Sequence, residues 1–544
     1  MPFTFDFSLF MFFSKLLFMK RTTILLASML IAACCAFTSQ AQDNLYHEHY
    51  RGQYHFSQRQ GWISDPCGFL YYEGKFHCYW WGCAESEDLV HWDEQNNHSQ
   101  LDVPHGKQCW TGCVVADVGN TAGFGEGKYI SCLTHNDPAS KRQTQGLGIS
   151  DDHGRTFSYY EGNPVLDIGY EDFRDPTVIW HEESQQWIMI VSKTLESKAA
   201  FYASKDLKKW EWLSDFGPAG RTYRCFECPD MFKLKVENGP HKGEERWVLV
   251  VSVDWDNEQY FVGDFDGREF HAEGLVDETG LYVDCAPDYY ASRTVKDFSS
   301  SSSGKTLGGE VYSIGWMSNW TYCRLLPVYP GTEAQRGGGT KGFWSVPRRL
   351  SLRQTPDGLR LSQQPKEELK TLRGRQLDFK GRLNPSITPI KPIAALGNTY
   401  EAEVTFDCSS SLLGGPRGTG STFGMNLCVG EGRKLVVTYS ADSHSLVVDR
   451  TQVDDFSAEQ KAKLCGKFER TCHSKVTPID GKLKLRIFVD KNSVEIFSED
   501  GLSVFSLQTF AADNHTAFEF FSIGAPIPYA MSVWPMASIW GNQK

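Results

Sequence analysis

The sequence lacks the signatures of several large classes of protein. It has no basic stripe, and its net charge of -12 at pH 7 argues against a nucleic-acid partner, which requires a basic surface. It contains no GxxxxGK[ST] loop and no GxGxxG directly after a strand, so the common nucleotide-binding signatures are missing. From about Tyr50 to Leu350 almost no stretch has the period of a long amphipathic helix. These absences favour an all-β protein with no nucleic-acid partner.

Cysteines are numerous, but they lack the spacing of a zinc finger. Of the 16 cysteines, Cys34 and Cys35 fall in a leader-like region and 14 remain. No pair of CxxC units with His or Cys partners occurs at finger spacing. Both disulfides and buried free thiols are compatible with the pattern, because most of these cysteines lie in apolar, strand-like runs.

The N-terminus predicts export. Basic residues at 20–21 precede an apolar run over 22–37, and a small-x-small cleavage site follows at 39–41, so residues 1–41 are expected to be a signal peptide. The run is too short for an ordinary membrane span, and no transmembrane span is expected in the mature chain. A lipoprotein-type cleavage box ends at Cys34, which leaves a lipid anchor there as an alternative. We therefore expect a periplasmic, extracellular or surface-anchored protein.

A repeat organises the first part of the chain. Short apolar runs alternate with turns, and 13% of the residues are aromatic, which favours strands. A strand-opening pattern recurs about 50 to 60 residues apart, and this spacing suits one four-stranded propeller blade per repeat. The openings lie at Asp65-Pro66, Trp110-Thr111, Asp175-Pro176, Glu227-Cys228 and Ala286-Pro287. We therefore predict a five-bladed β-propeller over residues 46–350, with the acids of these openings converging on the central axis.

A second repeat closes these units, and the chain changes character after them. The stretch Ser86–Trp92 matches Ser204–Trp210, and Ser150–Phe157 is a looser third copy. Residues 351–397 are Pro-rich in part and predict a linker with a short helix. From 398 to 544 strand patterns with hairpin turns predict a β-sandwich domain.

Three of the strand-opening residues are acids: Asp65, Asp175 and Glu227. Two carboxylates that face each other across a sugar are the usual equipment for cleaving a glycosidic bond. One must stay ionised as nucleophile, and the other must hold a proton, which requires burial or a nearby negative charge to raise its pKa. A third acid can stabilise positive charge in the transition state. Taken alone, Asp175 could simply form an ion pair with Arg174, and Glu227 could form a salt bridge on an edge strand. Because the three acids share one position of the repeat, a common active site is favoured.

The amino-acid sequences of these strand openings resemble the motifs of a known family. Trp62-Ile63-Ser64-Asp65-Pro66-Cys67-Gly68 resembles the Trp-Met-Asn-Asp-Pro-Asn-Gly motif of glycoside hydrolase family 32, which comprises invertases, inulinases and levanases. Further stretches are similar to the later motifs of that family in the same order: Phe173–Pro176, Phe226–Asp230, Phe261–Gly267, Gly315–Trp320, Ser345–Arg348 and, in the C-terminal sandwich, Leu485–Phe497.

The resemblance implies a retaining β-fructosidase that needs neither a cofactor nor a metal. Asp65 would attack the anomeric C2 of a fructosyl unit, Glu227 would act as acid and base, and Asp175 would stabilise the transition state. The substrate would be a fructoside: sucrose, a fructo-oligosaccharide, or a fructan such as inulin or levan. Candidate substrate-binding residues are Trp62, Ser64, Trp110, Thr111, Arg174, Cys228 and Trp316.

The departures from the family pattern leave alternatives open. Ser64 and Cys67 replace two asparagines, and Cys109–Gly112 replaces a Phe-Ser-Gly-like stretch. Serine lacks the amide donors that could bind sugar hydroxyls. One alternative is therefore a fructan-binding member without activity. Another is a different propeller glycosidase, either a sialidase, which Ser150–Phe157 resembles in one place, or an enzyme of the arabinoside or xyloside type.

Overall fold

The computed structural model describes most of the chain downstream of the expected leader. The described residues are 45–96, 101, 103–274, 280–299, 306–332, 339–409, 421–524 and 526–541. The expected signal peptide at 1–41 and the anchor cysteine Cys34 lie outside these ranges. Among the described residues, no helix is both long and apolar enough to cross a membrane. Residues His49–Lys544 form one compact unit.

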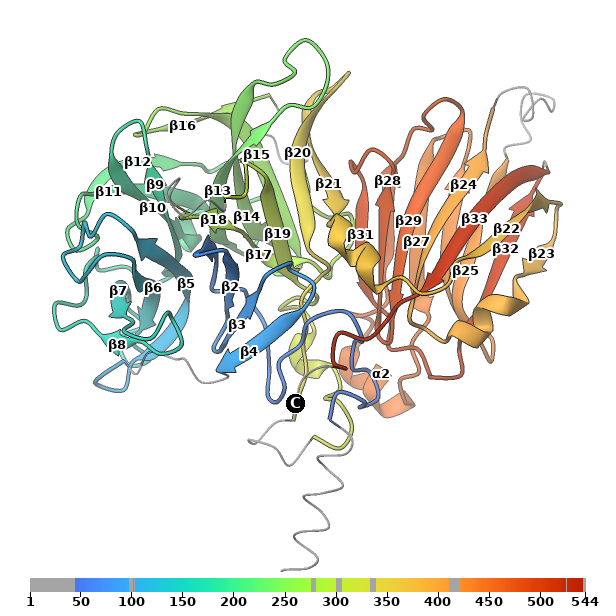
Figure 1. Cartoon of the computed structure of the whole chain (residues 1–544), viewed down its shortest axis with the longest axis horizontal. Helices are drawn as coiled ribbons and strands as arrows, with labels where there is room; N and C mark the ends of the chain where they lie inside the picture. Colours follow the sequence, from blue (N-terminus) through green and yellow to red (C-terminus); the bar gives the residue numbers. More distant parts are fainter. Residues whose placement is uncertain are drawn as a thin grey trace, which may run out of the picture. The chain divides into compact units, whose positions relative to one another are not determined.

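Five antiparallel sheets follow one another along the chain (Figure 1). The first contains β1 (Gly68–Tyr72), β2 (Lys75–Tyr79), β3 (Cys83–Ser86) and β4 (Trp92–Asn96), with β18 (Lys296–Asp297) added in parallel to β1. The second contains β5 (Gln108–Asp117), β6 (Lys128–Asn136), β7 (Gln143–Ile149) and β8 (Ser158–Tyr159). The third contains β9 (Phe173–His181), β10 (Gln186–Lys193), β11 (Lys198–Ser204) and β12 (Glu211–Phe216), with a 3-10 turn at Thr194–Glu196.

The fourth sheet contains β13 (Phe226–Lys235), β14 (Glu245–Val253), β15 (Asn257–Phe265) and β16 (Phe270–Glu273). The fifth contains β17 (Tyr290–Thr294), β19 (Val311–Trp316), β20 (Arg348–Thr355) and β21 (Gly358–Pro365), with a 3-10 turn at Cys323–Leu325. The first strands contact one another in the order β1, β5, β9, β13, β17 and back to β1. This closed ring confirms the predicted five-bladed propeller.

A β-bulge interrupts most of these first strands near the axis. The strand register shifts after Trp110 in β5, after Arg174 in β9, after Glu227 in β13 and after Tyr290 in β17. At the last three bulges, a non-glycine residue has a positive φ, with values of 62° at Asp175, 51° at Cys228 and 51° at Ala291. Bulges re-aim side chains beside active sites, and such strained backbone is concentrated at functional positions.

The second sequence repeat is a turn between the third and fourth strands of a blade. In one copy the Asp88 carboxylate accepts hydrogen bonds from the backbone N–H groups of Val90 and His91, at 2.9 and 2.8 Å. In another, Asp206 does the same for Lys208 and Lys209. In the third copy, the Asp152 carboxylate accepts a hydrogen bond from the backbone N–H of Thr156 at 2.9 Å. The acids of this repeat therefore stabilise turns, and this shared turn accounts for the resemblance of 150–157 to a sialidase motif.

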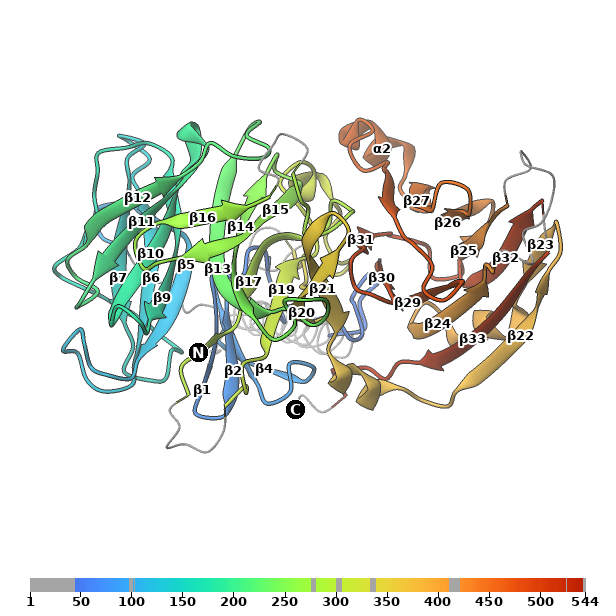
Figure 2. The same cartoon turned by 90° about the horizontal axis from the view of Figure 1, so that it is seen from above.

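Two further sheets form the C-terminal β-sandwich (Figure 2). In spatial order, one contains β22 (Leu377–Leu383), β33 (Ile527–Pro535), β24 (Tyr400–Asp407), β29 (Lys482–Asp490), β30 (Ser493–Ser498) and β31 (Val504–Gln508). The other contains β23 (Ile387–Pro389), β32 (Ala517–Ile523), β25 (Thr422–Gly430), β26 (Arg433–Ser440), β27 (Ser445–Gln452) and β28 (Thr471–Lys475). Helix α2 (Ala458–Leu464) connects β27 to β28, and buried aliphatic and aromatic side chains fill the space between the sheets.

The expected linker at 351–397 differs from the structure. Residues 348–365 form β20 and β21, which pair with β19 and complete the fifth blade. After β21, a 3-10 turn at Glu367–Leu372 leads to β22, which pairs with β33, and a second 3-10 turn at Lys391–Leu396 precedes β24. The local polarity of 351–365 resembled a linker because an outer blade strand is half exposed.

Buried ion pairs join the propeller to the sandwich. Arg348 in β20 donates to Glu495 in β30 at 2.9 Å. Arg450 in β27 pairs with Asp288, which precedes β17, and also donates to the hydroxyl of Tyr322. All of these charged side chains are fully buried. Removing one partner of such a pair leaves an uncompensated charge inside the protein.

We expect Asp288→Ala to destabilise the protein by about 3–5 kcal/mol, because Arg450 would remain buried without its counter-ion. Thermal unfolding monitored by tryptophan fluorescence measures the effect. In the double variant Asp288→Ala/Arg450→Met both charges are removed, so much of the lost stability should return. Asp151→Ala at the surface is the control. A single Asp288 variant as stable as this control would contradict the prediction.

Candidate active site

The three predicted acids lie together at the axis of the propeller. Asp65 lies three residues before the start of β1, Asp175 lies in β9 and Glu227 lies in β13, and all three are nearly buried. Because β1, β9 and β13 are all first strands of blades, their N-terminal ends open on the same end of the channel. Acids that occupy equivalent positions of the sequence repeat therefore lie close together in the structure.

Asp65 is held through one of its two carboxylate oxygens. The Thr111 hydroxyl in β5 donates to Asp65 Oδ2 at 3.0 Å. The other oxygen, Oδ1, has no hydrogen-bond partner in the part of the chain that the structure describes. An oriented carboxylate with one free oxygen is suited to attack an electrophilic carbon.

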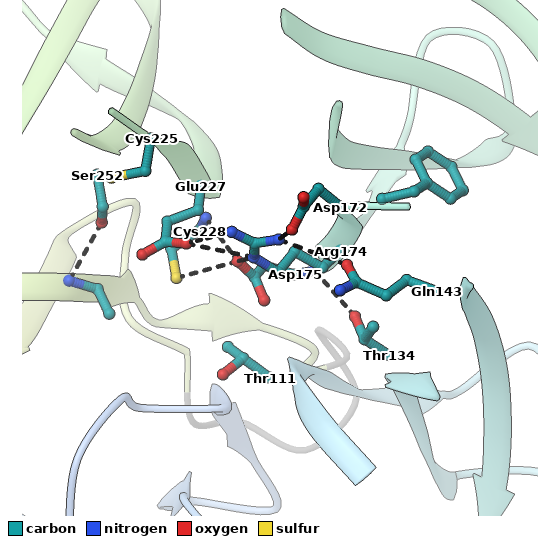
Figure 3. Close-up of polar contacts among 12 residues, drawn as sticks. Thr111, Thr134, Gln143, Asp172, Arg174, Asp175, Cys225, Glu227, Cys228 and Ser252 are labelled. Atoms are coloured by element: carbon teal, nitrogen blue, oxygen red, sulfur yellow. Dashed lines mark hydrogen bonds and ion pairs between the residues drawn. The ribbon is translucent and has the colours of Figure 1, made fainter. Parts of the chain in front are cut away.

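Arg174 connects the other two acids (Figure 3). Its Nε and Nη2 atoms donate to Glu227 Oε2 at 3.2 and 2.9 Å, whereas its Nε lies 3.6 Å from Asp175 Oδ2. Asp172 accepts a hydrogen bond from Nη1 and anchors the guanidinium from behind. The arginine beside Asp175 thus pairs mainly with Glu227.

Glu227 and Asp175 receive further hydrogen bonds from the bulges. The Tyr290 hydroxyl donates to Glu227 Oε1 at 2.7 Å, so both oxygens of Glu227 are oriented. The backbone N–H of Cys228 donates to Asp175 Oδ2 at 3.2 Å, and the backbone N–H of Asp175 donates to the Thr134 hydroxyl at 2.9 Å. The strained bulge at Cys228 thereby aims a backbone donor at the neighbouring acid.

Burial and mutual repulsion set the electrostatics of the site. Burial, with the charges of Asp175 and Glu227, raises the pKa of Asp65 to about 7, against the lowering effects of the Thr111 hydroxyl and Arg293. Burial also raises the pKa of Asp175 to about 6; Arg174 and Arg293 oppose this rise and Glu227 adds to it. The pKa values of Asp65 and Asp175 therefore lie closer to neutral pH than those of ordinary carboxyl groups, as is common at functional sites.

Arg293 in β17 supplies a buried positive charge close to the acids. Its Nη1 donates to the carbonyl oxygens of Cys228 and Pro229 at 2.9 and 3.1 Å, and the side chain is buried. It lowers the pKa of both Asp65 and Asp175. A fixed cation of this kind offsets part of the repulsion among the acids.

The structure separates the predicted substrate-binding residues into groups. Trp62 and Trp110 are partly exposed, and Lys341 Nζ lies 5.1 Å from the centre of the Trp62 ring. Trp316 has 0% of its surface exposed and packs against Trp62 and Trp320, so it supports the wall of the site without reaching it.

Among the described residues, three of the smaller predicted ones contact the acids, and Ser64 does not share such a contact. Thr111 and Arg174 orient Asp65 and Glu227, as described above. Cys228 is buried, and both its N–H and its thiol face Asp175. Ser64 is also nearly buried, and its carbonyl oxygen accepts a hydrogen bond from the Trp344 indole at 3.3 Å.

Sequence reasoning assigned no role to Tyr290, Arg293 or Asp172. A signal for Tyr290 was present, because it occupies the same bulge position in the fifth blade as Glu227 and Arg174 occupy in theirs. Arg293 and Asp172 carried no comparable signal. Their roles depend on which backbone and side-chain groups the bulges bring beside them.

The 14 cysteines within the described residues are all free, and eleven of them are buried. Among the described residues, no group of His, Cys, Asp and Glu side chains is arranged to hold a metal ion.

The fold and the site define a carboxylate-based glycosidase on a five-bladed propeller. The model of the glycosyl hydrolases family 32 N-terminal domain matches residues 55–365, and that of the family 32 C-terminal domain matches residues 368–535. The chain belongs to glycosyl hydrolase family 32.

Its relatives include curated enzymes and solved structures. It is 32% identical to a levanase from Bacillus subtilis, over 96% of this chain and 76% of that one. It is 29% identical to an extracellular exo-inulinase from Aspergillus awamori, over 91% of this chain and 96% of that one. The crystal structure of an exo-inulinase from the same fungus superposes with a TM-score of 0.77 at 28% identity, covering 91% of this chain and all (100%) of the other. A fructofuranosidase from Schwanniomyces occidentalis complexed with fructose gives 0.74 at 25% identity, over 90% and 99% of the two chains.

We expect Thr111→Val to shift the acid limb of kcat/KM to higher pH by about 0.4–1 unit, the equivalent of one hydrogen bond. The hydroxyl lowers the pKa of Asp65, and an attacking Asp65 must be ionised, so activity is lost as the pH falls through that pKa. Without the hydroxyl the loss begins at higher pH. Thr111→Ser keeps the donor and should retain the wild-type limb. Identical limbs for the Val and Ser variants would refute this role.

Proposed function

We propose that this protein hydrolyses β-fructofuranosidic bonds in fructans and related fructosides by a retaining double displacement. The observation that carries the proposal is the meeting of Asp65, Asp175 and Glu227 at one end of the axis, with a free oxygen on Asp65 and both oxygens of Glu227 oriented. The relatives named levanase and exo-inulinase support a fructan as substrate.

In the first step Asp65 Oδ1 attacks C2 of the fructosyl unit while Glu227 transfers a proton to the departing oxygen. The C2–O bond to the leaving group breaks, and a fructosyl ester on Asp65 forms. In the second step Glu227 takes a proton from water, the resulting oxygen attacks C2, and the ester bond breaks to release fructose and the Asp65 carboxylate.

Asp175 and Arg174 complete this assignment. Asp175, anchored by the Cys228 N–H, is placed to accept hydrogen bonds from fructose hydroxyls and to stabilise the positive charge that develops in the transition state. Arg174 holds Glu227 in its orientation through both proton transfers. Trp62 and Trp110 are the partly exposed rings available for contact with the sugar.

Incubating the purified protein with sucrose, short fructo-oligosaccharides, inulin and levan, with product sizes resolved, tests this proposal. Release of fructose or of shorter fructo-oligosaccharides from at least one of them is the expected result. Binding without release of any product would instead support a fructan-binding member without activity. Cleavage only of arabinosides, xylosides or sialosides would overturn the proposal. Retention is checked in a methanol–water mixture, where it yields methyl β-fructofuranoside.

We also propose that the protein is exported. The signal-like sequence at 1–41 supports this, as does the extracellular location in the name of the exo-inulinase relatives. Mass spectrometry of the mature N-terminus distinguishes cleavage after Ala41 from a lipid-modified Cys34.

A further inference from the structure

A group of exposed aromatic and cationic side chains lies beside the acid–base residue. Tyr223 is 65% exposed and Trp255 is 42% exposed. The Arg224 guanidinium lies over both rings, 5.1 Å from the centre of Tyr223 and 5.7 Å from that of Trp255. We call these three residues the Trp255 cluster. Large aromatic side chains this exposed gain little from burial, so their presence calls for another explanation.

The backbone beneath the cluster is strained in the way expected of a functional loop. Trp255 lies in the turn between β14 and β15, where Val253 pairs with Asn257. Its φ is 67°, and those of Asp254 and Arg224 are 57° and 69°. A turn of this kind favours glycine or asparagine. A bulky residue in the left-handed region is a genuine outlier, and here the side chain keeps 42% of its surface exposed.

The strained turn is fixed in place on both sides. Arg221 Nε and Nη2 donate to Asp254 Oδ2 at 2.9 and 2.6 Å. The backbone N–H of Trp255 donates to Cys225 Sγ at 3.2 Å. The carbonyl oxygen of Trp255 accepts a hydrogen bond from the backbone N–H of Trp320 at 2.9 Å. These hydrogen bonds fix the backbone that carries the exposed Trp255 ring.

Short contacts connect the cluster to the catalytic acids. Cys225 Sγ lies 3.4 Å from the Tyr290 hydroxyl, which donates to Glu227. On the other side, Trp320 packs against Trp62 with 5.8 Å between ring centres, and Trp62 precedes Asp65 by three residues. The cluster is thus connected to Glu227 through Cys225 and Tyr290, and to Trp62 through Trp320.

We propose that the Trp255 cluster binds fructosyl units of the leaving chain beyond the sugar next to the cleaved bond. This inference rests on the proposed function. Glu227 must donate its proton to the leaving oxygen, so the departing chain lies on the Glu227 side of the site. Aromatic faces pack against the C–H faces of sugar rings, and the Arg224 N–H groups can donate to hydroxyl oxygens.

The consequence is selectivity for chain length. The leaving group of sucrose is a single sugar adjacent to the cleaved bond, so it does not extend to the cluster. An inulin or levan chain continues outward and gains contacts there. Such contacts made by remote units of the substrate raise kcat/KM for the chain without altering the reacting groups.

The variants Trp255→Gly and Tyr223→Ala, alone and combined, test the proposal. Glycine suits the left-handed turn, so Trp255→Gly removes the ring while relieving strain, and it should unfold no earlier than wild type. For the double variant we expect kcat/KM on long fructo-oligosaccharides to fall about 10- to 30-fold, while kcat/KM on sucrose changes less than about twofold. Trp212→Ala, at an exposed tryptophan on β12, is the matched control and should change neither.

A binding measurement separates this proposal from the proposed function. In an Asp65→Asn background, titration calorimetry with long and short fructo-oligosaccharides should show weaker binding of the long chains alone when the cluster is removed. Equal losses on sucrose and on long chains, or no loss on either, would overturn the cluster proposal while leaving hydrolysis intact. If no fructoside is hydrolysed, the proposed function fails, and a length-dependent loss of binding would still support the cluster.

Discussion

Asp65→Asn is expected to reduce kcat on fructosides by at least about 10³-fold, because the amide cannot form the fructosyl ester. Asparagine keeps an oxygen for the Thr111 hydroxyl, so the local geometry is preserved. Fructose release at saturating substrate measures the effect. Near-full activity in this variant would show that Asp65 is not the nucleophile.

The same substitution is expected to stabilise the fold at neutral pH. The folded-state pKa of Asp65, about 7, lies above its unfolded value of 3.8. The folded protein therefore binds the additional proton between these values, and its stability falls as the pH rises through them. Asparagine does not ionise, so the gain is absent near pH 4 and complete above pH 7, where it should be on the order of 2–4 kcal/mol.

Thermal unfolding of both proteins from pH 4 to pH 8 tests this prediction. The difference in Tm between Asp65→Asn and wild type should widen with pH and then level off. Asp151→Asn, which removes an exposed carboxylate, should show no such trend. A pH-independent difference would mean that the carboxylate of Asp65 is not destabilised by its surroundings. A stable, inactive enzyme is the expected trade-off at a site built from crowded acids.

Glu227→Gln is expected to lower kcat on natural fructosides by about 10²–10⁴-fold, the contribution of a positioned general acid. Glutamine retains one oxygen, which can accept from Arg174, and its amide can donate to the Tyr290 hydroxyl oxygen, so the fold around it should persist. With fructosyl fluoride, whose leaving group needs no proton, the first step should survive. Water activation is still missing, so a fructosyl ester should accumulate on Asp65.

Intact-protein mass spectrometry detects this ester as an added fructosyl unit. Tyr290→Phe is the matched variant, because it keeps the Glu227 carboxyl and removes one hydrogen bond to it. It should lose about 10-fold in kcat and accumulate no ester. If Glu227→Gln were equally slow on the fluoride and on sucrose, with no ester detected, Glu227 would not be the acid–base residue.

Much of the architecture followed from sequence alone. The spacing of the five strand openings predicted the five blades, and the acids at three of them, Asp65, Asp175 and Glu227, predicted a common site at the axis. This worked because each blade repeats one local pattern, and because first strands share the axis. The blade boundary at 350 differed because an outer strand such as β21 is half exposed and has little sequence signature.

Tertiary structure alone decided how the side chains pair. The sequence places Arg174 next to Asp175, yet the bulge in β9 turns its guanidinium to Glu227, a partner in the neighbouring blade. Trp316 stands in a family-like motif but is buried behind Trp62. The exposure of Trp255 depends on a left-handed turn that no local preference of tryptophan predicts. The local sequence repeat therefore determines the arrangement of the blades. Bulges and contacts between blades determine which atoms face the substrate.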